Sequence, residues 1–132
     1  MTIYQAIVLN PRWPKSFTFS PAVRAGNLVF ISGTTATDDK GQIVGPGDIA
    51  AQTRHIFSKF AAVLESVGGT LANIVETTDY VLTFDDYEKT ADIRRELFKG
   101  PPWPAATGVM VSGLVRKDAL IEIKAFAVLP SS

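Results

Sequence analysis

One acidic residue interrupts an apolar run near the end of the chain, in the stretch ALIEIKAFAVL (119–129). Glu122 stands between two isoleucines, and a carboxylate in an apolar strand is costly to bury unless it is hydrogen-bonded, protonated or paired. Such a group can act as a general base or orient a water molecule. It can equally form an ion pair with Lys124, Arg116 or a residue of another subunit. Glu122 is therefore the first candidate for acid–base chemistry, with the ion pair as the alternative.

Three further residues have types that suit ligand binding. Thr107 offers a hydroxyl and a backbone N–H at the start of a strand, where such groups can point at a ligand carbonyl. Threonine is also common in strands for reasons of packing alone. In the pair Ser32-Gly33, the glycine either lets a ligand approach the backbone closely or marks a bulge. We expect these three residues to line a site together with Glu122.

The stretch PPWPAATGVMV (101–111) combines stiffness with small side chains. Its prolines fix φ near about −65° and withhold N–H groups, so the segment is a rigid approach to a strand. The small residues that follow keep the space beyond it empty, and nearby aromatic residues could wall an uncharged, roomy pocket. The residues of this predicted pocket are Trp13, Phe19, Trp103, Ala105, Ala106 and Gly108. Alternatively, Trp103 only anchors the core or an interface.

Several other chemistries find little support. The chain has no cysteine, which excludes disulfides, a thiol nucleophile and thiolate metal sites. Its single histidine, His55, falls beside Gln52 and Lys59 on the polar side of a helix, where we expect a surface residue. Zinc chemistry and a Ser-His triad are therefore disfavoured. The run GQIVGPGD (41–48) lacks the lysine and the spacing of a phosphate loop. Neither a metal nor an organic cofactor is implied.

Three charged residues have a surface interpretation and a functional one. Asp79 is expected at an edge or on the exposed face of its strand, although a pocket acid stays open. Arg94 and Arg95 could supply a cation to a site. A solvated helix face is the expected place for both.

The spacing of apolar residues predicts eight elements that must position these side chains. In chain order they are strands at 3–8, 17–23 and 28–34, a helix at 49–67, a strand at 74–83, a helix from Asp85 or Asp86 to Gly100, and strands at 108–111 and 119–129. Asp48 suits the N-cap of the first helix and Gly68 its C-terminal stop. The last two strands are expected to pair antiparallel through the polar connection RKD. The order is β-β-β-α-β-α-β-β.

The last strand carries apolar residues on both of its faces. One face holds Ile121, Ile123, Ala125, Ala127 and Leu129, and the other holds Leu120, Glu122, Lys124, Phe126 and Val128. Two helices can cover only one side of the sheet, so we expect the second face to be buried against another subunit. The sequence therefore predicts a homo-oligomer.

Length and composition set the class of protein. A chain of 132 residues is expected to form one domain spanning 1–132. It is 46% hydrophobic with 13 basic and 13 acidic residues, which disfavours disorder, nucleic-acid binding and membrane-surface binding. The start, MTIYQAIVLNP, lacks the basic region and apolar core of a signal peptide. A cytoplasmic protein is expected.

Five motifs in order resemble the RidA family, also called the YjgF/YER057c/UK114 family, over residues 17–129. They are FSPAVRAGNLVFISG (19–33), GDIAAQTRHIF (47–57), TTDYVLTFDDYEKT (77–90), WPAATGV (103–109) and ALIEIKAFAVL (119–129). The resemblance implies an α+β, chorismate-mutase-like subunit in which one sheet is backed by two helices. It also implies a trimer around a central β-barrel, with ligand pockets in clefts between subunits.

The resemblance further implies an activity, the hydrolysis of reactive enamines and imines to a keto acid and ammonia. Family members with this activity carry an arginine after the Pro-Ala of the motif, which grips the substrate carboxylate. Ala106 occupies that position here. Polar side-chain groups are also missing at other family positions: Phe19 replaces a tyrosine, Pro21 and Thr34 replace glutamines, and Ala91 replaces an asparagine. The family positions that persist are Ser32, Gly33, Thr107 and Glu122.

These departures leave two main hypotheses. The first is a divergent deaminase in which Glu122 and Thr107 position water against a larger, flatter enamine such as 2-aminomuconate, bound by Phe19, Ser32, Gly33, Thr34, Trp103, Ala106 and Gly108. The second is a non-catalytic, ligand-binding or regulatory trimer. RNA cleavage, reported for some relatives, is disfavoured by the neutral charge. The expected partners are a small molecule and further copies of the chain, without nucleic acid or membrane.

Overall fold

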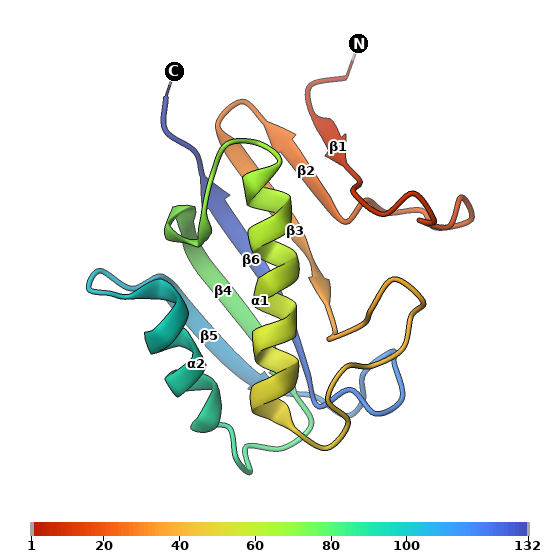
Figure 1. Ribbon diagram of the computed structural model, residues 1–132, viewed down its shortest axis with the longest axis vertical. Helices are drawn as coiled ribbons and strands as arrows, with labels where there is room; N and C mark the ends of the chain where they lie inside the picture. The colour runs from red at the N-terminus through yellow and green to blue at the C-terminus, as the bar shows by residue number, and fades with distance from the viewer. Residues whose placement is uncertain (1, 132) are drawn as a thin grey trace.

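A six-stranded mixed sheet with two helices on one face forms the body of the molecule (Figure 1). The structure is a computed structural model, and it describes residues 2–131. The strands are β1 (Gln5–Ile7), β2 (Ala22–Ala25), β3 (Leu28–Thr34), β4 (Ile74–Val81), β5 (Ala105–Met110) and β6 (Ile121–Val128). The helices are α1 (Ile49–Glu65) and α2 (Lys89–Phe98), with a 3₁₀ turn at Leu71–Asn73. This arrangement confirms the expected α+β class and the order of the elements.

The strand order is β1-β2-β3-β6-β4-β5, and every pair is antiparallel except β4–β5. The expected antiparallel pairing of the last two strands is therefore wrong. Because α2 carries the chain back across the sheet, β4-α2-β5 is a crossover unit and its strands must run parallel. The segment that follows β5 returns the chain to the middle of the sheet, where β6 inserts between β3 and β4.

The core lies between α1 and the helix-covered face of the sheet (Figure 1). Asp48 caps α1 as expected, since its Oδ1 accepts a hydrogen bond from Ala51 N at 3.0 Å. Gly68 follows the helix with a φ of +82°, which suits glycine at a helix end. The alternation of β6 is confirmed, because Ile121, Ile123, Ala125, Ala127 and Leu129 are all buried.

Helix α2 begins later than expected. The predicted caps, Asp85 and Asp86, lie in the preceding turn, and Asp86 has a left-handed φ of +61°. The helix starts after Glu88, whose side chain makes no capping hydrogen bond. It ends at Lys99, which takes the left-handed conformation one residue before the expected Gly100. The predicted strand at 17–23 is also mostly wrong, because only its last two residues belong to β2.

The polar side of α1 is covered, contrary to the surface position expected for His55. Gln52 is fully buried: its Nε2 donates to the carbonyls of Gly45 and Asp118, and its Oε1 accepts from Leu120 N. His55 Nε2 lies 3.1 Å from the carbonyl oxygen of Thr37. The loop after β3 folds over this side of the helix, which a helical pattern alone cannot reveal.

The opposite face of the sheet has no covering layer among residues 2–131. Phe30 of β3 is 42% exposed there, and its ring packs edge-on against Phe126 of β6 at 4.7 Å between centroids. Val109 of β5 is exposed as well. We call this surface the open face. In the described part of the chain, neither helix has the length and apolarity needed to cross a bilayer.

Candidate functional site

Glu122 and Gly33 meet on the open face. Glu122 projects from β6, and its Oε2 lies 2.6 Å from the point where a Cβ on Gly33 would stand. The pairing of β3 with β6 is irregular between Ile31 and Thr34, so Gly33 belongs to a bulge. Among residues 2–131, Glu122 forms no ion pair, and neither Lys124 nor Arg116 neutralises it. The missing side chain of Gly33 therefore makes a niche for an unpaired carboxylate.

Ser32 connects this niche to a group of aromatic residues. Its Oγ donates to the carbonyl of Ser20 at 2.6 Å, and its backbone N–H donates to the carbonyl of Pro21 at 2.9 Å. The neighbouring rings of Trp13, Phe17 and Phe19 lie 5.2–5.3 Å apart, and Trp13 Nε1 donates to the carbonyl of Phe19. We call these three rings the aromatic cluster. Ser32 holds the segment that carries it beside the Glu122 niche.

Thr107 shares the open face with Glu122 but does not reach it within one chain. In the β4–β5 register Thr107 lies opposite Thr78, whereas Glu122 lies opposite Tyr80 in the β4–β6 register. Strand β4 therefore separates the two side chains. Neighbouring strands are about 4.8 Å apart, so β5 and β6 are separated by roughly 10 Å. A single chain does not place Glu122 and Thr107 around one water molecule.

Three other predicted site residues lie on the helix-covered face. Thr34 accepts a hydrogen bond from Lys59 Nζ of α1 at 2.7 Å, so its hydroxyl points toward the helix. An added Cβ on Gly108 would meet the Tyr87 hydroxyl at 2.5 Å. Ala106 lies beneath α2, beside Trp103. The sheet thus divides the predicted site into two groups, one on each face.

A hollow of about 320 Å³ opens beside Ala106, between β5 and α2. Ala91 and Pro104 leave it wide, and the rings of Phe98 and Trp103 flank it. Its polar lining consists of Thr77, Arg94 and Arg95. We call it the Ala106 hollow. Phe19 lies at the β2 side of the sheet, so the aromatic cluster and Trp103 do not form one pocket within a chain.

Asp79 and Arg94 form a buried ion pair, which corrects the surface positions expected for both. Arg94 Nη2 donates to Oδ1 and Oδ2 of Asp79 at 2.7 and 2.6 Å, and its Nη1 donates to Thr77 Oγ1 at 3.1 Å. The side chain of Arg94 is 17% exposed and that of Asp79 is 2% exposed. The Tyr87 hydroxyl also donates to Asp79, and burial together with this hydrogen bond raises the pKa of Tyr87 to about 12.

Sequence reasoning missed this polar group, although a signal was present. Thr77 and Asp79 alternate with Val81, which is fully buried, so all three side chains had to face the helices. An acid at a buried strand position requires a partner. Arg94 provides it because its long side chain reaches from α2 over the ring of Phe57, 5.2 Å from the guanidinium carbon.

Lys59 forms a second polar group, under the loop that follows β3. Its Nζ donates to Thr34 Oγ1, the Thr35 carbonyl and Thr37 Oγ1 at 2.7, 3.1 and 2.9 Å. Burial lowers the pKa of Lys59 to about 8. All three of its donors are used, so Lys59 fixes the loop beside the Gly33 bulge.

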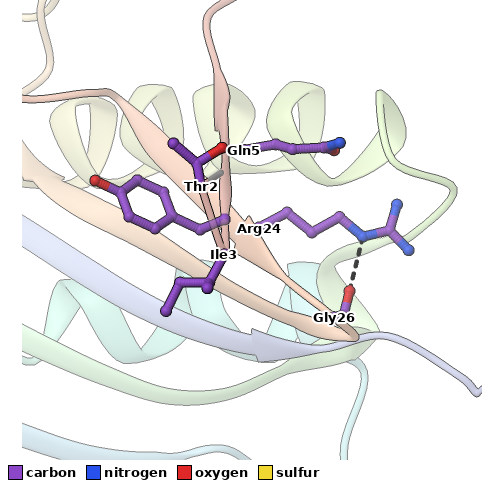
Figure 2. Close-up of a pocket in the computed structure, with 6 residues that line it drawn as sticks. Thr2, Ile3, Gln5, Arg24 and Gly26 are labelled. Atoms are coloured by element: carbon purple, nitrogen blue, oxygen red, sulfur yellow. Dashed lines mark hydrogen bonds between the residues drawn. The ribbon is translucent and has the colours of Figure 1, made fainter.

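A further pocket, of about 270 Å³, lies beside β1 and β2 and contains none of the predicted site residues. Figure 2 shows Arg24 there, with its Nε donating to the carbonyl of Gly26 at 2.9 Å. Its wall is formed by the N-terminal segment, including the exposed Ile3. The side chains drawn there include one cation and no acid–base pair, so we do not place the reaction in it.

Comparison with known proteins places the chain in a family. Residues 12–129 match the family model described as Endoribonuclease L-PSP. The RutC family protein PH0854 of Pyrococcus horikoshii is 38% identical over 122 residues, covering 92% of this chain and 95% of that protein. The 3-aminoacrylate deaminase RutC of Acinetobacter baylyi is 35% identical over 114 residues, covering 86% and 89%. The crystal structure of YyfA, a Rid family protein from Yersinia pestis, matches with a TM-score of 0.84 at 30% identity, covering 96% of this chain and 99% of that one.

The chain is a member of the RidA (YjgF/YER057c/UK114) family, as its motifs predicted. Its sheet with two helices on one face is the family's fold. The matches span nearly the whole chain and nearly the whole length of these relatives, so the likeness concerns the complete fold and not a fragment of it.

Proposed function

We propose that this protein is an enamine or imine deaminase in which Glu122 activates water. The observation that carries the proposal is the unpaired carboxylate of Glu122 in the Gly33 niche on the open face. Membership of the RidA family and 35% identity to a 3-aminoacrylate deaminase support the reaction class. The site takes a small molecule and needs no metal.

The reaction requires one base and one water molecule. An enamine that is protonated on carbon becomes an iminium ion, and Glu122 removes a proton from water while the water oxygen bonds to the iminium carbon. The same carboxyl group then returns that proton to the amino nitrogen. As the C–N bond breaks and ammonia leaves, the hydroxyl group of the adduct loses its proton to solvent and the carbon–oxygen bond becomes C=O. This released proton replaces the solvent proton that added to the enamine carbon, so the net reaction consumes one water molecule and regenerates the Glu122 carboxylate.

We further propose that the site is completed by a second chain in a trimer. The two groups of candidate residues lie on opposite faces of one sheet, so a single chain cannot close them around one ligand. The exposed Phe30 and the unpaired outer edge of β5 leave surfaces on which another copy can pack. In this arrangement the Glu122 niche and the aromatic cluster of one chain face the Ala106 hollow of its neighbour.

The substrate we propose is a conjugated, planar enamine. Ala106 removes the motif arginine, which disfavours small imines derived from amino acids. Two compounds fit this description, 3-aminoacrylate and the ring-derived 2-aminomuconate. In both, conjugation keeps the nitrogen, the reacting carbon and the carboxylate in one plane.

Ammonia release from freshly generated substrates tests the proposal. Wild-type protein is expected to release ammonia from 3-aminoacrylate or 2-aminomuconate and to act poorly on 2-iminopropionate. Glu122→Gln is expected to reduce turnover by about 10²-fold or more, the usual contribution of a general base. Glu76→Gln, an exposed glutamate on the neighbouring β4, is the matched control. Turnover that is equal in wild type and Glu122→Gln would reject Glu122 as the base.

A binding trimer without catalysis is the second candidate, and Ala106 is the observation that favours it. It predicts that ligands bind while no ammonia appears from any of the three compounds. RNA cleavage, suggested by the description of the family model and by that of one similar structure, is disfavoured by the equal numbers of acidic and basic residues.

A further inference from the structure

The polar lining of the Ala106 hollow contains two cations and no acid. Arg94 and Arg95 both reach it, whereas Asp79, the partner of Arg94, lies behind the hollow and not on its wall. Asp92, the partner of Arg95, is 76% exposed at the surface, where water and salt screen the pair. A ligand in the hollow therefore meets guanidinium groups and hydrophobic rings.

Arg94 is fixed in position before any ligand arrives. Arg94 donates to both carboxylate oxygens of Asp79 through Nη2 and to Thr77 through Nη1, and the ring of Phe57 supports the guanidinium plane. Its Nε–H and one Nη1–H have no hydrogen-bond partner among residues 2–131. The only buried unpaired side-chain polar atom of those residues is Thr53 Oγ1, so the Nε of Arg94 retains access to solvent. A guanidinium in this state can accept a further anion without rearranging.

The shape of the hollow indicates what accompanies the anion. Ala91 and Ala106 leave the space in front of Arg94 empty, and the rings of Phe98 and Trp103 flank it. Pockets for organic ligands begin near about 300 Å³, so the hollow has room for more than a three-carbon acid. Aromatic walls favour a flat, unsaturated body.

We propose that Arg94 binds the carboxylate of a planar unsaturated acid in the Ala106 hollow. The inference deepens the proposed function, on which it rests for the reaction but not for the binding. Arg94 on α2 thus supplies the cation that the family's motif arginine would supply from β5, and it does so from another wall of the hollow. The ligand must be long enough to reach it, so of the two proposed substrates this arrangement favours 2-aminomuconate over the three-carbon 3-aminoacrylate.

Binding of two stable probes tests this assignment without turnover. Benzoate and benzamide share a flat ring and differ in charge. Titration calorimetry with wild-type protein is expected to show benzoate binding roughly tenfold more tightly than benzamide, because only benzoate forms charge-assisted hydrogen bonds. Equal affinities, or no binding of benzoate at millimolar concentration, would overturn the proposal even if the protein proves to be a deaminase.

Three variants test whether benzoate binds in the Ala106 hollow. Ala106→Leu fills the hollow without touching the ion pair and is expected to abolish benzoate binding. The double variant Asp79→Asn with Arg94→Gln removes both charges together, so no buried charge is left alone, and it is expected to remove the preference for benzoate. Asp86→Asn with Lys89→Gln removes one charge of each sign from an exposed ion pair outside the hollow and is the matched control. Circular dichroism checks that each variant is folded, and a preference that persists in the folded double variant refutes the role of Arg94.

The same variants separate this inference from the proposed function. If Glu122→Gln loses ammonia release but still prefers benzoate, both proposals stand. If wild type releases ammonia but the double variant keeps both its KM for 2-aminomuconate and the preference for benzoate, the deaminase survives and the role of Arg94 fails. If benzoate binds through Arg94 and no substrate is turned over, the binding inference survives alone.

Discussion

Glu122 and Gly33 occupy one space on the open face: the carboxylate Oε2 lies 2.6 Å from where a Cβ on residue 33 would stand. A real Cβ cannot approach so closely, so Gly33→Ala must displace the carboxylate. Turnover of the best enamine substrate is expected to fall by at least about tenfold, because a small misplacement of a catalytic group is costly. KM is expected to change less than kcat, since the residues proposed to bind the ligand in the Ala106 hollow are untouched.

The control for this prediction is Gly113→Ala. A Cβ added at Gly113 meets nothing within 4 Å, so the same chemical change leaves the structure in place. Thermal unfolding of both variants separates displacement of Glu122 from general destabilisation. If Gly33→Ala is fully active and as stable as wild type, the carboxylate does not work from this niche.

Breaking the Asp79–Arg94 pair is expected to destabilise the protein strongly. Asp79→Ala leaves a buried guanidinium without its carboxylate, a loss of about 3–5 kcal/mol for buried pairs. Asp92→Ala breaks the exposed pair with Arg95 and is expected to change the free energy of unfolding by less than about 1 kcal/mol. Urea denaturation at fixed protein concentration measures both. Similar losses of unfolding free energy in the two variants would show that the buried pair contributes no more to stability than the exposed pair.

Lys59 makes the stability of the protein depend on pH in the alkaline range. Burial lowers its pKa to about 8 in the folded state, against an ordinary value of 10.5. Between these values the unfolded state binds more protons than the folded state, so the contribution of Lys59 to stability rises with pH. The difference in unfolding free energy between wild type and Lys59→Met is therefore expected to shift in favour of wild type from pH 7.5 to 9.5.

Staying below pH 10 in this experiment avoids Tyr87. Its pKa is raised to about 12, so its contribution to stability is present below pH 10 and is lost as the pH rises through 12. Lys40→Met, at an exposed lysine, supplies the control for the loss of one surface charge. A difference between wild type and Lys59→Met that stays constant from pH 7.5 to 9.5 would contradict the lowered pKa of Lys59.

Local pattern predicted most of the elements, whereas strand pairing and the burial of polar residues depended on contacts distant in sequence. Alternation along 119–129 assigned Ile121 and Glu122 to opposite faces, and the structure agrees. The same pattern could not show that β6 inserts between β3 and β4, because strand pairing depends on the whole chain. The polar residues of α1 were misplaced for a related reason, since the loop that buries Gln52 has no periodicity of its own.

The candidate site shows the same division. The resemblance identified Ala106 and Glu122 from local motifs, but it could not indicate that the sheet separates them. Asp79 and Arg94 lie fifteen positions apart in the sequence, and each is of a residue type that is usually found at the surface. Only the crossing of α2 over β4 brings them together. Buried polar partners of this kind are the feature that sequence patterns predict least well.

The open face leads to the last prediction, which concerns assembly. Phe30 is 42% exposed and packs on Phe126, and water contact with such a surface is costly unless another chain covers it. Sedimentation velocity is expected to show a trimer for wild type. Phe30→Glu places a charge on this face and is expected to shift the protein toward smaller species. Val115→Glu also introduces a glutamate, at a loop residue that is 92% exposed, and is expected to leave the proposed trimer intact. If the site is shared between chains as we propose, Phe30→Glu must lose ammonia release together with the trimer, and full activity in a monomer would refute the shared site.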